Sequence, residues 1–198
     1  MKKILHIKSS PNALNSVTNK LGTAIIENIR HYYNEVQVEE LDIVAVQFPH
    51  ITHEIIEAFR MPDLMKSSEQ KALTEMSGKA ISQIDQSDVV VISVPMHNYS
   101  IPSALKAYLD HIIRPGLTFG LTTKGPVGRF TGKKAYIAFS SGWDFTTVAL
   151  KDNDYCIPYL KSVLKLIGII DITVYKIEGV AGHAKDLELH RVIAQIVL

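Results

Sequence analysis

The sequence predicts an α/β protein with a doubly wound, five-stranded parallel sheet and helices on both faces. Five short apolar runs alternate with segments long enough for helices, an order typical of parallel sheets. Two of the runs, 89–92 and 135–139, are continuously apolar, as expected of strands covered on both faces. The 198 residues, 46% of them hydrophobic, are enough to bury the core of one domain spanning residues 1–198.

The apolar runs and the helical periodicity place the individual elements. We expect strands at 3–8, 36–41, 88–95, 133–140 and 171–177, and helices at 18–32, 53–60, 68–84, 102–113, 155–167 and 184–196. Ser67 or Ser68 is suited to cap the third helix, Pro102 to occupy the first turn of the fourth, and Gly168 to end the fifth. The stretch 42–66 is expected to be an irregular excursion after the second strand, suited to contacts between subunits.

Composition excludes several classes of protein. The 21 Lys and Arg nearly balance the 20 Asp and Glu, so nucleic acid is not expected as a partner. No apolar run approaches the roughly 20 residues that span a bilayer, and the chain opens directly into a strand, so we expect a cytoplasmic protein without membrane partners. Cys156, the only cysteine, is expected to be buried and inert. "HEIIE" at 53–57 lacks the second histidine of a zinc-protease helix, and we expect no metal.

The segment after the first strand is rich in hydroxyl and amide groups. Open parallel sheets bind ligands at the carboxyl ends of their strands, and "SSPNALNSVTN" (9–19) leads from such an end into a helix. Ser10, Ser16 and Thr18 near the free N–H groups of a helix N-terminus suit a phosphate monoester. The alternative is that Ser16 or Thr18 only caps the helix while the other polar residues solvate a loop.

Two later strand ends have residues suited to a flat ligand. Met96, His97, Asn98 and Tyr99 follow the most apolar strand, and thioether, aromatic and amide groups can cover and hydrogen-bond a planar ring such as isoalloxazine. The next strand ends in Ser140, Ser141, Gly142 and Trp143, where the glycine permits close approach of the backbone to a ring edge. The alternative here is a serine-rich turn with Trp143 packed into the core.

With these residues in view, the chain resembles the FMN-dependent NADH:quinone oxidoreductases of the azoreductase (azobenzene reductase) family, which have a flavodoxin-like fold. The resemblance runs nearly end to end. It is carried by "PMHNYSIPSALKAYLDHIIRPGLTF", "KSSPNALNSVTNKL", "GPVGRFTGKKA" and "YLKSVLKLIGI", which occur in the order and spacing that the family shows.

The resemblance implies a binding site for one FMN per subunit. The phosphate would be held by Ser10 and by Ser16, Val17 and Thr18, with Val17 acting through its backbone N–H. The ring would be bordered by residues 96–99 and 140–143. The chain departs from the family at His97, usually a large aromatic residue, at "SSGW", commonly Ser-Arg-Gly-Gly, and at Leu121, where some relatives have an aromatic residue that lines the substrate pocket.

The resemblance also implies the activity. NADH would reduce FMN, and a quinone or an aromatic azo compound would then take two electrons, in ping-pong order. No catalytic side chain is required, and backbone N–H groups near Asn98 and Tyr99 would stabilise charge arriving on the ring. His97 is expected to bind rather than to catalyse, with protons coming from water. Family members are homodimers with flavin sites near the subunit interface.

Two other classes of protein fit the sequence less well. A flavodoxin-like FMN electron carrier without small-molecule turnover would have a Gly-containing Thr/Ser phosphate loop and strongly acidic charge, whereas this chain has a formal charge of +1. An NAD(P)-dependent dehydrogenase without flavin would need a glycine fingerprint after the first strand, which "KSSPNALNS" does not provide.

Overall fold

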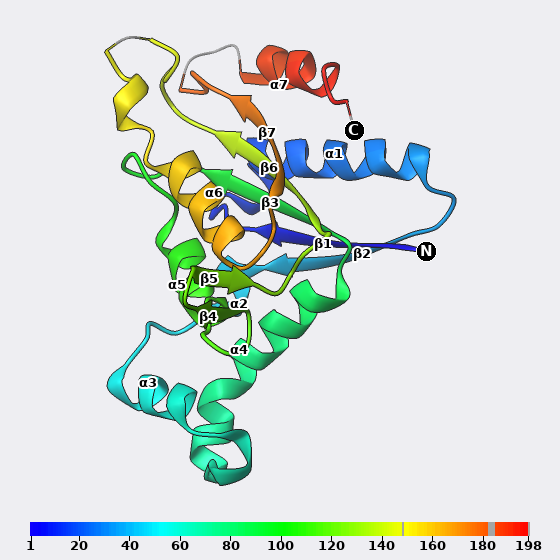
Figure 1. Cartoon of the computed structure of the whole chain (residues 1–198). Coiled ribbons are helices and arrows are strands. Elements are labelled where there is room, and N and C mark those ends of the chain that lie inside the picture. Colours follow the sequence, from blue (N-terminus) through cyan, green and yellow to red (C-terminus); the bar gives the residue numbers. More distant parts are fainter. Residues whose placement is uncertain (148, 182–184, 198) are drawn as a thin grey trace.

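A five-stranded parallel sheet forms the centre of the molecule. The computed structural model describes residues 1–147, 149–181 and 185–197. The strands lie in the order β2 (Val36–Asp42), β1 (Lys2–Lys8), β3 (Val89–Pro95), β6 (Lys134–Ser140) and β7 (Asp171–Ile177) (Figure 1). The prediction of a five-stranded parallel sheet is confirmed. The winding direction reverses between β1 and β3, the kind of position at which such sheets bind ligands.

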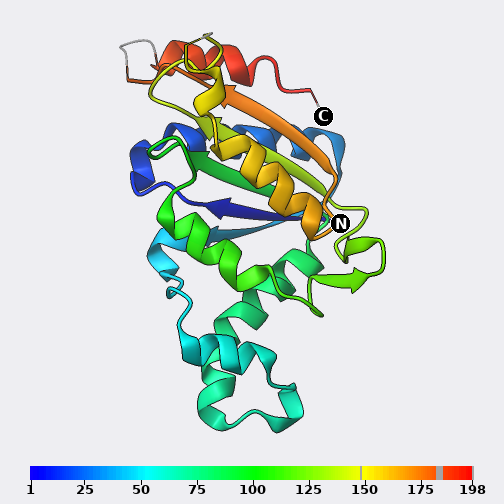
Figure 2. The same cartoon turned by 60° about the vertical axis from the view of Figure 1, so that its left-hand side comes forward.

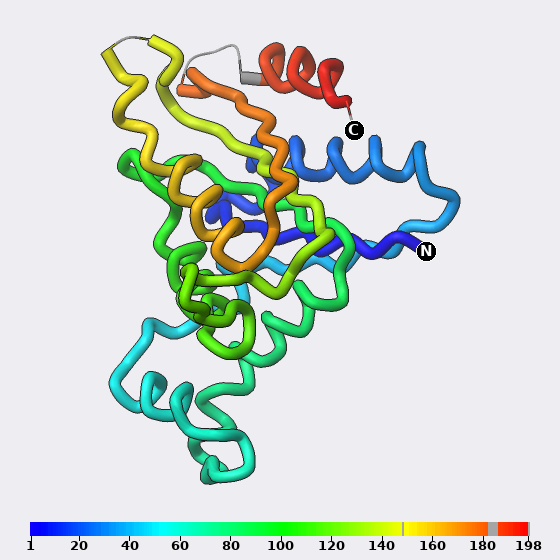
Figure 3. Tube along the Cα trace, viewed as in Figure 1, coloured from blue at the N-terminus to red at the C-terminus, as the bar shows by residue number. Residues whose placement is uncertain are grey.

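Helices cover both faces, which explains the continuously apolar strands. The helices α1 (Val17–Tyr32) and α7 (Lys185–Ile193) lie side by side on one face (Figure 3). The helices α4 (Ser68–Gln86), α5 (Ser103–Ile112) and α6 (Cys156–Leu166) cover the other. Successive strand residues alternate between the two cores, so that Ile4 packs under α1 while Leu5 packs under α4 and α5.

Local signals set several helix ends. Ser67 caps α4 and forms a capping box with Gln70. At the end of α6, Gly168 has φ +104°, its N–H donates to the Lys165 carbonyl, and the next N–H donates to Leu164, which is a Schellman ending. Pro102 differs from expectation: it is the N-cap of α5, with extended ψ, and its carbonyl already accepts from Lys106 N at 3.0 Å.

The stretch after β2 is more regular than expected. It contains α2 (Ile43–Val46), α3 (His53–Arg60) and the 3-10 turn η2 (Asp63–Met65), and it forms with the start of α4 a lobe that extends from the body (Figure 2). Arg114 anchors this lobe. Its guanidinium lies 3.3 Å from the centre of the Phe59 ring and donates to Ser77 Oγ at 2.9 Å.

The structure contains an antiparallel hairpin of β4 (Phe119–Thr122) and β5 (Gly125–Gly128) that the sequence did not predict. Its four-residue strands are too short to produce a clear alternation. The hairpin packs on the end of α6, where a Cβ on Gly128 would lie 2.0 Å from Gly168 N, so a close backbone contact requires glycine there. This contact places the hairpin toward the amino ends of the strands (Figure 2).

Within the described ranges, every helix is too short or too polar to cross a bilayer.

Candidate functional site

Three loops meet at the carboxyl edge of the sheet, because β1, β3 and β6 are neighbours in it. Lys8 pairs with Ser93, and Pro95 pairs with Ser140, so the three strands end at nearly the same level. Met96 N donates to the Ser140 carbonyl at 2.7 Å, which links the second loop to the third. The structure thus brings together all three stretches that the sequence singled out.

The loop between β1 and α1 places buried hydroxyls at a helix N-terminus. Ser16 is the N-cap of α1 and its Oγ accepts from Asn19 N at 3.1 Å, so the capping alternative holds for this residue. Ser16 Oγ also lies 2.9 Å from Thr18 Oγ1, and Ser10 Oγ accepts from Asn12 N. The N–H groups of Val17 and Thr18 have no acceptor within the helix. Hydroxyls and free N–H groups therefore occupy one short stretch, as a phosphate requires.

The turn after β3 has an uncommon backbone. His97 and Ser100 exchange two backbone hydrogen bonds of 2.9 Å, and the residues between them have positive φ, 49° at Asn98 and 67° at Tyr99. This pattern is a type I′ turn. Left-handed backbone in a residue such as tyrosine costs about 1 kcal/mol or more, and such strain is concentrated at functional sites.

The surroundings of this turn suit a ring. His97, Asn98 and Tyr99 are exposed, whereas Met96 packs partly against the core. A cavity of about 500 Å³ borders the turn on the side of α5 and is lined by His97, Asn98, Ser100, Ile101, Ser103, Lys106 and Tyr159. The backbone N–H groups of Asn98 and Tyr99 donate to no acceptor in the described part of the chain.

The loop after β6 holds its serines inside and its tryptophan outside. Ser140 and Ser141 are buried, and Ser141 Oγ donates to the Trp143 carbonyl at 2.8 Å. The side chain of Trp143 is 59% exposed, so the alternative of a core tryptophan is wrong; Phe145 is the aromatic residue of this loop that packs inside. Among the described residues, a Cβ on Gly142 would meet only Ala181, at an ordinary 3.8 Å. Protein packing therefore does not explain this glycine, which leaves room for a ligand.

Two residues singled out in the sequence are not part of the three loops. Leu121 is on the hairpin and is 77% exposed, toward the opposite ends of the strands, so within one chain it does not border the three loops. Cys156 is fully buried, and burial raises the pKa of its thiol to about 12. The expectation that this cysteine is buried and unreactive agrees with its environment.

The structure adds residues that sequence reasoning missed. Tyr155 N donates to the Tyr99 carbonyl at 3.0 Å, and the Phe145 ring meets Tyr99 edge-on at 6.0 Å, so the segment after Trp143 supports the strained turn. This segment has no hydrophobic periodicity and no motif that would indicate a functional role. Glu178 lies beneath it, where burial raises the pKa of the carboxyl group.

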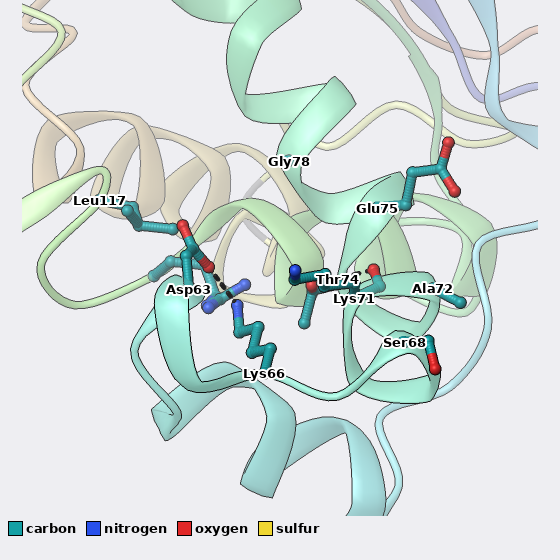
Figure 4. A pocket seen from close by; sticks show the side chains of 10 residues that line it. Asp63, Lys66, Ser68, Lys71, Ala72, Thr74, Glu75, Gly78 and Leu117 are labelled. Atoms are coloured by element: carbon teal, nitrogen blue, oxygen red, sulfur yellow. Dashed lines mark hydrogen bonds and ion pairs between the residues drawn. The ribbon is translucent and has the colours of Figure 1, made fainter.

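A second cavity, of about 590 Å³, lies far from the strand ends, at the start of α4 (Figure 4). Asp63 and Lys66 form an ion pair of 2.6 Å across it, and none of the predicted site residues lines it. This cavity belongs to the lobe anchored by Arg114 and has no connection with the three loops.

Comparison with known proteins agrees with this site. Residues 2–197 match a family model described as a flavodoxin-like fold. The chain is 39% identical to an FMN-dependent NADH:quinone oxidoreductase of Herminiimonas arsenicoxydans over 94% of this chain and 92% of that protein. It is 38% identical to a protein of the same name from Francisella philomiragia over 95% and 92% of the two chains.

Solved structures give the same result. An FMN-dependent NADH-azoreductase from Bacillus anthracis in complex with FMN superposes with a TM-score of 0.88, at 26% identity, over 98% of this chain and 95% of that one. The full-length match in sequence and in fold leads to one assignment. The chain belongs to the flavodoxin-like family of FMN-dependent NADH:quinone oxidoreductases.

Proposed function

We propose that this protein binds FMN and uses NADH to reduce quinones by two electrons and to cleave aromatic azo compounds. The names of its relatives, FMN-dependent NADH:quinone oxidoreductase and FMN-dependent NADH-azoreductase, support both reactions. One observation in the structure carries the proposal: the strained 97–100 turn presents free N–H groups beside a hydroxyl-rich helix N-terminus. FMN can use both features, because its ring accepts hydrogen bonds from free N–H groups and its phosphate suits a hydroxyl-rich helix N-terminus.

The residues present fit FMN. Ser10, Ser16 and Thr18 offer hydroxyl groups, and Val17 a backbone N–H, to the phosphate, while the first turn of α1 favours negative charge. Residues 96–99 and 140–143 border the ring. When bound, FMN supplies the redox chemistry by accepting a hydride from NADH and passing two electrons to the acceptor.

The protein's own contribution is orientation and charge stabilisation. The N–H groups of Asn98 and Tyr99 are fixed by the two His97–Ser100 hydrogen bonds, so they need not reorganise when negative charge develops near them. Gly142 would permit close approach to the ring edge, and the exposed side chains of Trp143 and His97 would border the ring. No nucleophile is needed, and protons come from water.

We further propose a homodimer in the cytoplasm. The β4–β5 hairpin exposes Leu121 and Val127, 77% and 55% accessible, at a distance from the site in its own chain. A partner subunit would cover these two side chains. NADH as the donor fits a cytoplasmic protein.

An anaerobic absorption experiment tests the proposed function. FMN is added to the purified protein, excess flavin is removed, and NADH and then a benzoquinone are added. Flavin absorption bands that bleach with NADH and return with quinone support the proposal. Bands that NADH leaves unchanged contradict it and favour an electron carrier, and a protein that retains no FMN contradicts both.

A further inference from the structure

Two polar side chains interrupt the apolar face beneath α1. On this face, β1 contributes Ile4 and then His6, and β3 contributes Val89, Val91 and then Ser93. His6 and Ser93 are both fully buried. Apolar residues at these two positions would continue the pattern of both strands, so the polar pair needs a reason that hydrophobic packing does not supply.

Hydrogen bonding fixes the state of this pair. Ser93 Oγ lies 2.9 Å from the Thr18 carbonyl, which can only accept, so the serine hydroxyl donates there. Its remaining contact, 2.8 Å to His6 Nε2, must then be accepted from the ring N–H. Nε2 of His6 therefore carries a proton. The ring's other nitrogen, Nδ1, has no hydrogen-bond partner among the described residues.

Ser93 holds both ends of the loop between β1 and α1. Its hydroxyl binds the Thr18 carbonyl in the first turn of the helix. Its carbonyl accepts from Ser9 N at 3.1 Å and from Ser9 Oγ at 2.8 Å, where the loop leaves β1. Between these two anchors lie all the residues that the proposed function assigns to the FMN phosphate, Ser10, Ser16, Val17 and Thr18.

The helix makes room for the pair at Gly22. A Cβ at this position would lie 2.4 Å from Ser93 Oγ and 2.5 Å from His6 Nε2. Glycine inside a helix costs about 1 kcal/mol relative to alanine. The close approach of α1 to His6 and Ser93 requires this glycine, which is a second and independent sign that the contact is specific.

Burial, more than the charges around it, keeps the His6 ring neutral. Burial and the nearby Lys8 ammonium lower the pKa of His6 to about 4, against the opposing effect of Glu40, whose carboxylate lies 3.8 Å from Nδ1. Lys8 and Glu40 pair with each other at 2.7 Å. At neutral pH the His6 ring is consequently uncharged, and its unpartnered Nδ1 carries no proton.

We propose that His6 and Ser93 are positioning residues for the FMN phosphate. They fix both ends of the loop so that its hydroxyl and N–H groups are held in place before the phosphate binds, which lowers the entropic cost of binding. This inference rests on the proposed function, because it assumes that the loop binds FMN.

Riboflavin, which lacks only the phosphate, provides the decisive comparison. Flavin-free protein is titrated with FMN and with riboflavin, and the ratio of the two dissociation constants measures the contribution of the phosphate. Removal of the Ser93 hydroxyl in Ser93→Ala should reduce the preference for FMN by about tenfold, the effect of one hydrogen bond, with riboflavin binding nearly unchanged. A general loss of structure would weaken both ligands alike.

A matched control and a rescue sharpen the test. Ser87→Ala removes another buried hydroxyl, which donates to Ile84 O at 2.8 Å just before β3, and should leave the preference unchanged. His6→Leu removes the donor to Ser93, whereas His6→Gln retains an N–H at similar reach. The preference should fall in His6→Leu and be largely restored in His6→Gln, so the inference remains testable even if Ser93→Ala fails to fold.

The outcomes distinguish failure of the positioning role from failure of the phosphate site. If the wild-type protein prefers FMN and Ser93→Ala and His6→Leu keep that preference, the positioning role is wrong while the phosphate site stands. If the variants lose FMN and riboflavin equally, the pair only stabilises the fold and the inference is again wrong. If the wild-type protein binds FMN and riboflavin equally, the phosphate site fails, and the positioning role fails with it.

Discussion

The β1–α1 loop and the loop after β6 lie at the same edge of the sheet, yet they are built differently. The first is held by buried hydrogen bonds to Ser93, and its residues Ser10 and Ser16 are buried. The second leaves Gly142 open and Trp143 mostly exposed. In the proposed function the first loop binds a phosphate group, which is the same in every FMN, so a loop held by buried hydrogen bonds suits it. Acceptors vary, and an open loop can change without disturbing the sheet.

The largest effect should come from acidifying the protein, because the buried His6 binds Ser93, which holds the β1–α1 loop in place. The pKa of His6 falls from its ordinary 6.5 to about 4 on folding, so between these values the unfolded chain binds a proton that the folded protein does not. The contribution of His6 to the free energy of unfolding is fully present above pH 6.5. It is lost as the pH drops toward 4, by roughly 3 kcal/mol in total.

Denaturant unfolding at several pH values checks this expectation. The free energy of unfolding of His6→Gln should vary less between pH 6.5 and 4 than that of the wild-type protein, while other groups, including His111 with its lowered pKa, contribute equally to both. Parallel pH profiles of the two proteins would show that burial does not lower the pKa of His6.

A methyl group added under α1 should have the next largest effect. In Gly22→Ala the new Cβ collides with His6 and Ser93, and overpacking should cost roughly 2 kcal/mol despite the better helix propensity of alanine. Gly78→Ala in α4, where no described residue lies within 4 Å of the added Cβ, is the control and should gain up to about 1 kcal/mol. Chemical denaturation measures both. Equal stabilisation by the two substitutions would contradict the tight contact at Gly22.

Substitutions at two helix N-caps distinguish an effect on stability from an effect on FMN binding. Ser16→Ala and Ser67→Ala each remove an N-cap hydroxyl, from α1 and α4, and each should cost about 1 kcal/mol of stability. Only Ser16→Ala should also weaken FMN, because only this cap lies in the proposed phosphate site. Equal FMN affinity in the two variants would remove Ser16 from that site.

The sequence predicted the β1–α1 loop better than the loop after β6. Apolar runs and hydroxyls next to a helix start are local patterns, so the five strands and the β1–α1 loop could be predicted directly. The exposure of Trp143 could not, because it depends on Phe145 taking the inner position. The His6–Ser93 contact joins residues 87 positions apart, and only the register of β1 against β3 and the approach of Gly22 bring them together.

The smallest effect on stability should come from Trp143, where the open region contacts solvent. Trp143→Ala removes a side chain that is 59% exposed, so the unfolding free energy should change by no more than about 0.5 kcal/mol. The loop itself persists, since Ser141 binds the backbone carbonyl of residue 143 and not its ring. Steady-state kinetics with a small benzoquinone and a bulky azo dye should then show KM changing for the acceptors while FMN affinity stays constant. A drop in FMN affinity with unchanged acceptor KM would assign Trp143 to cofactor binding and reverse the division between the two loops.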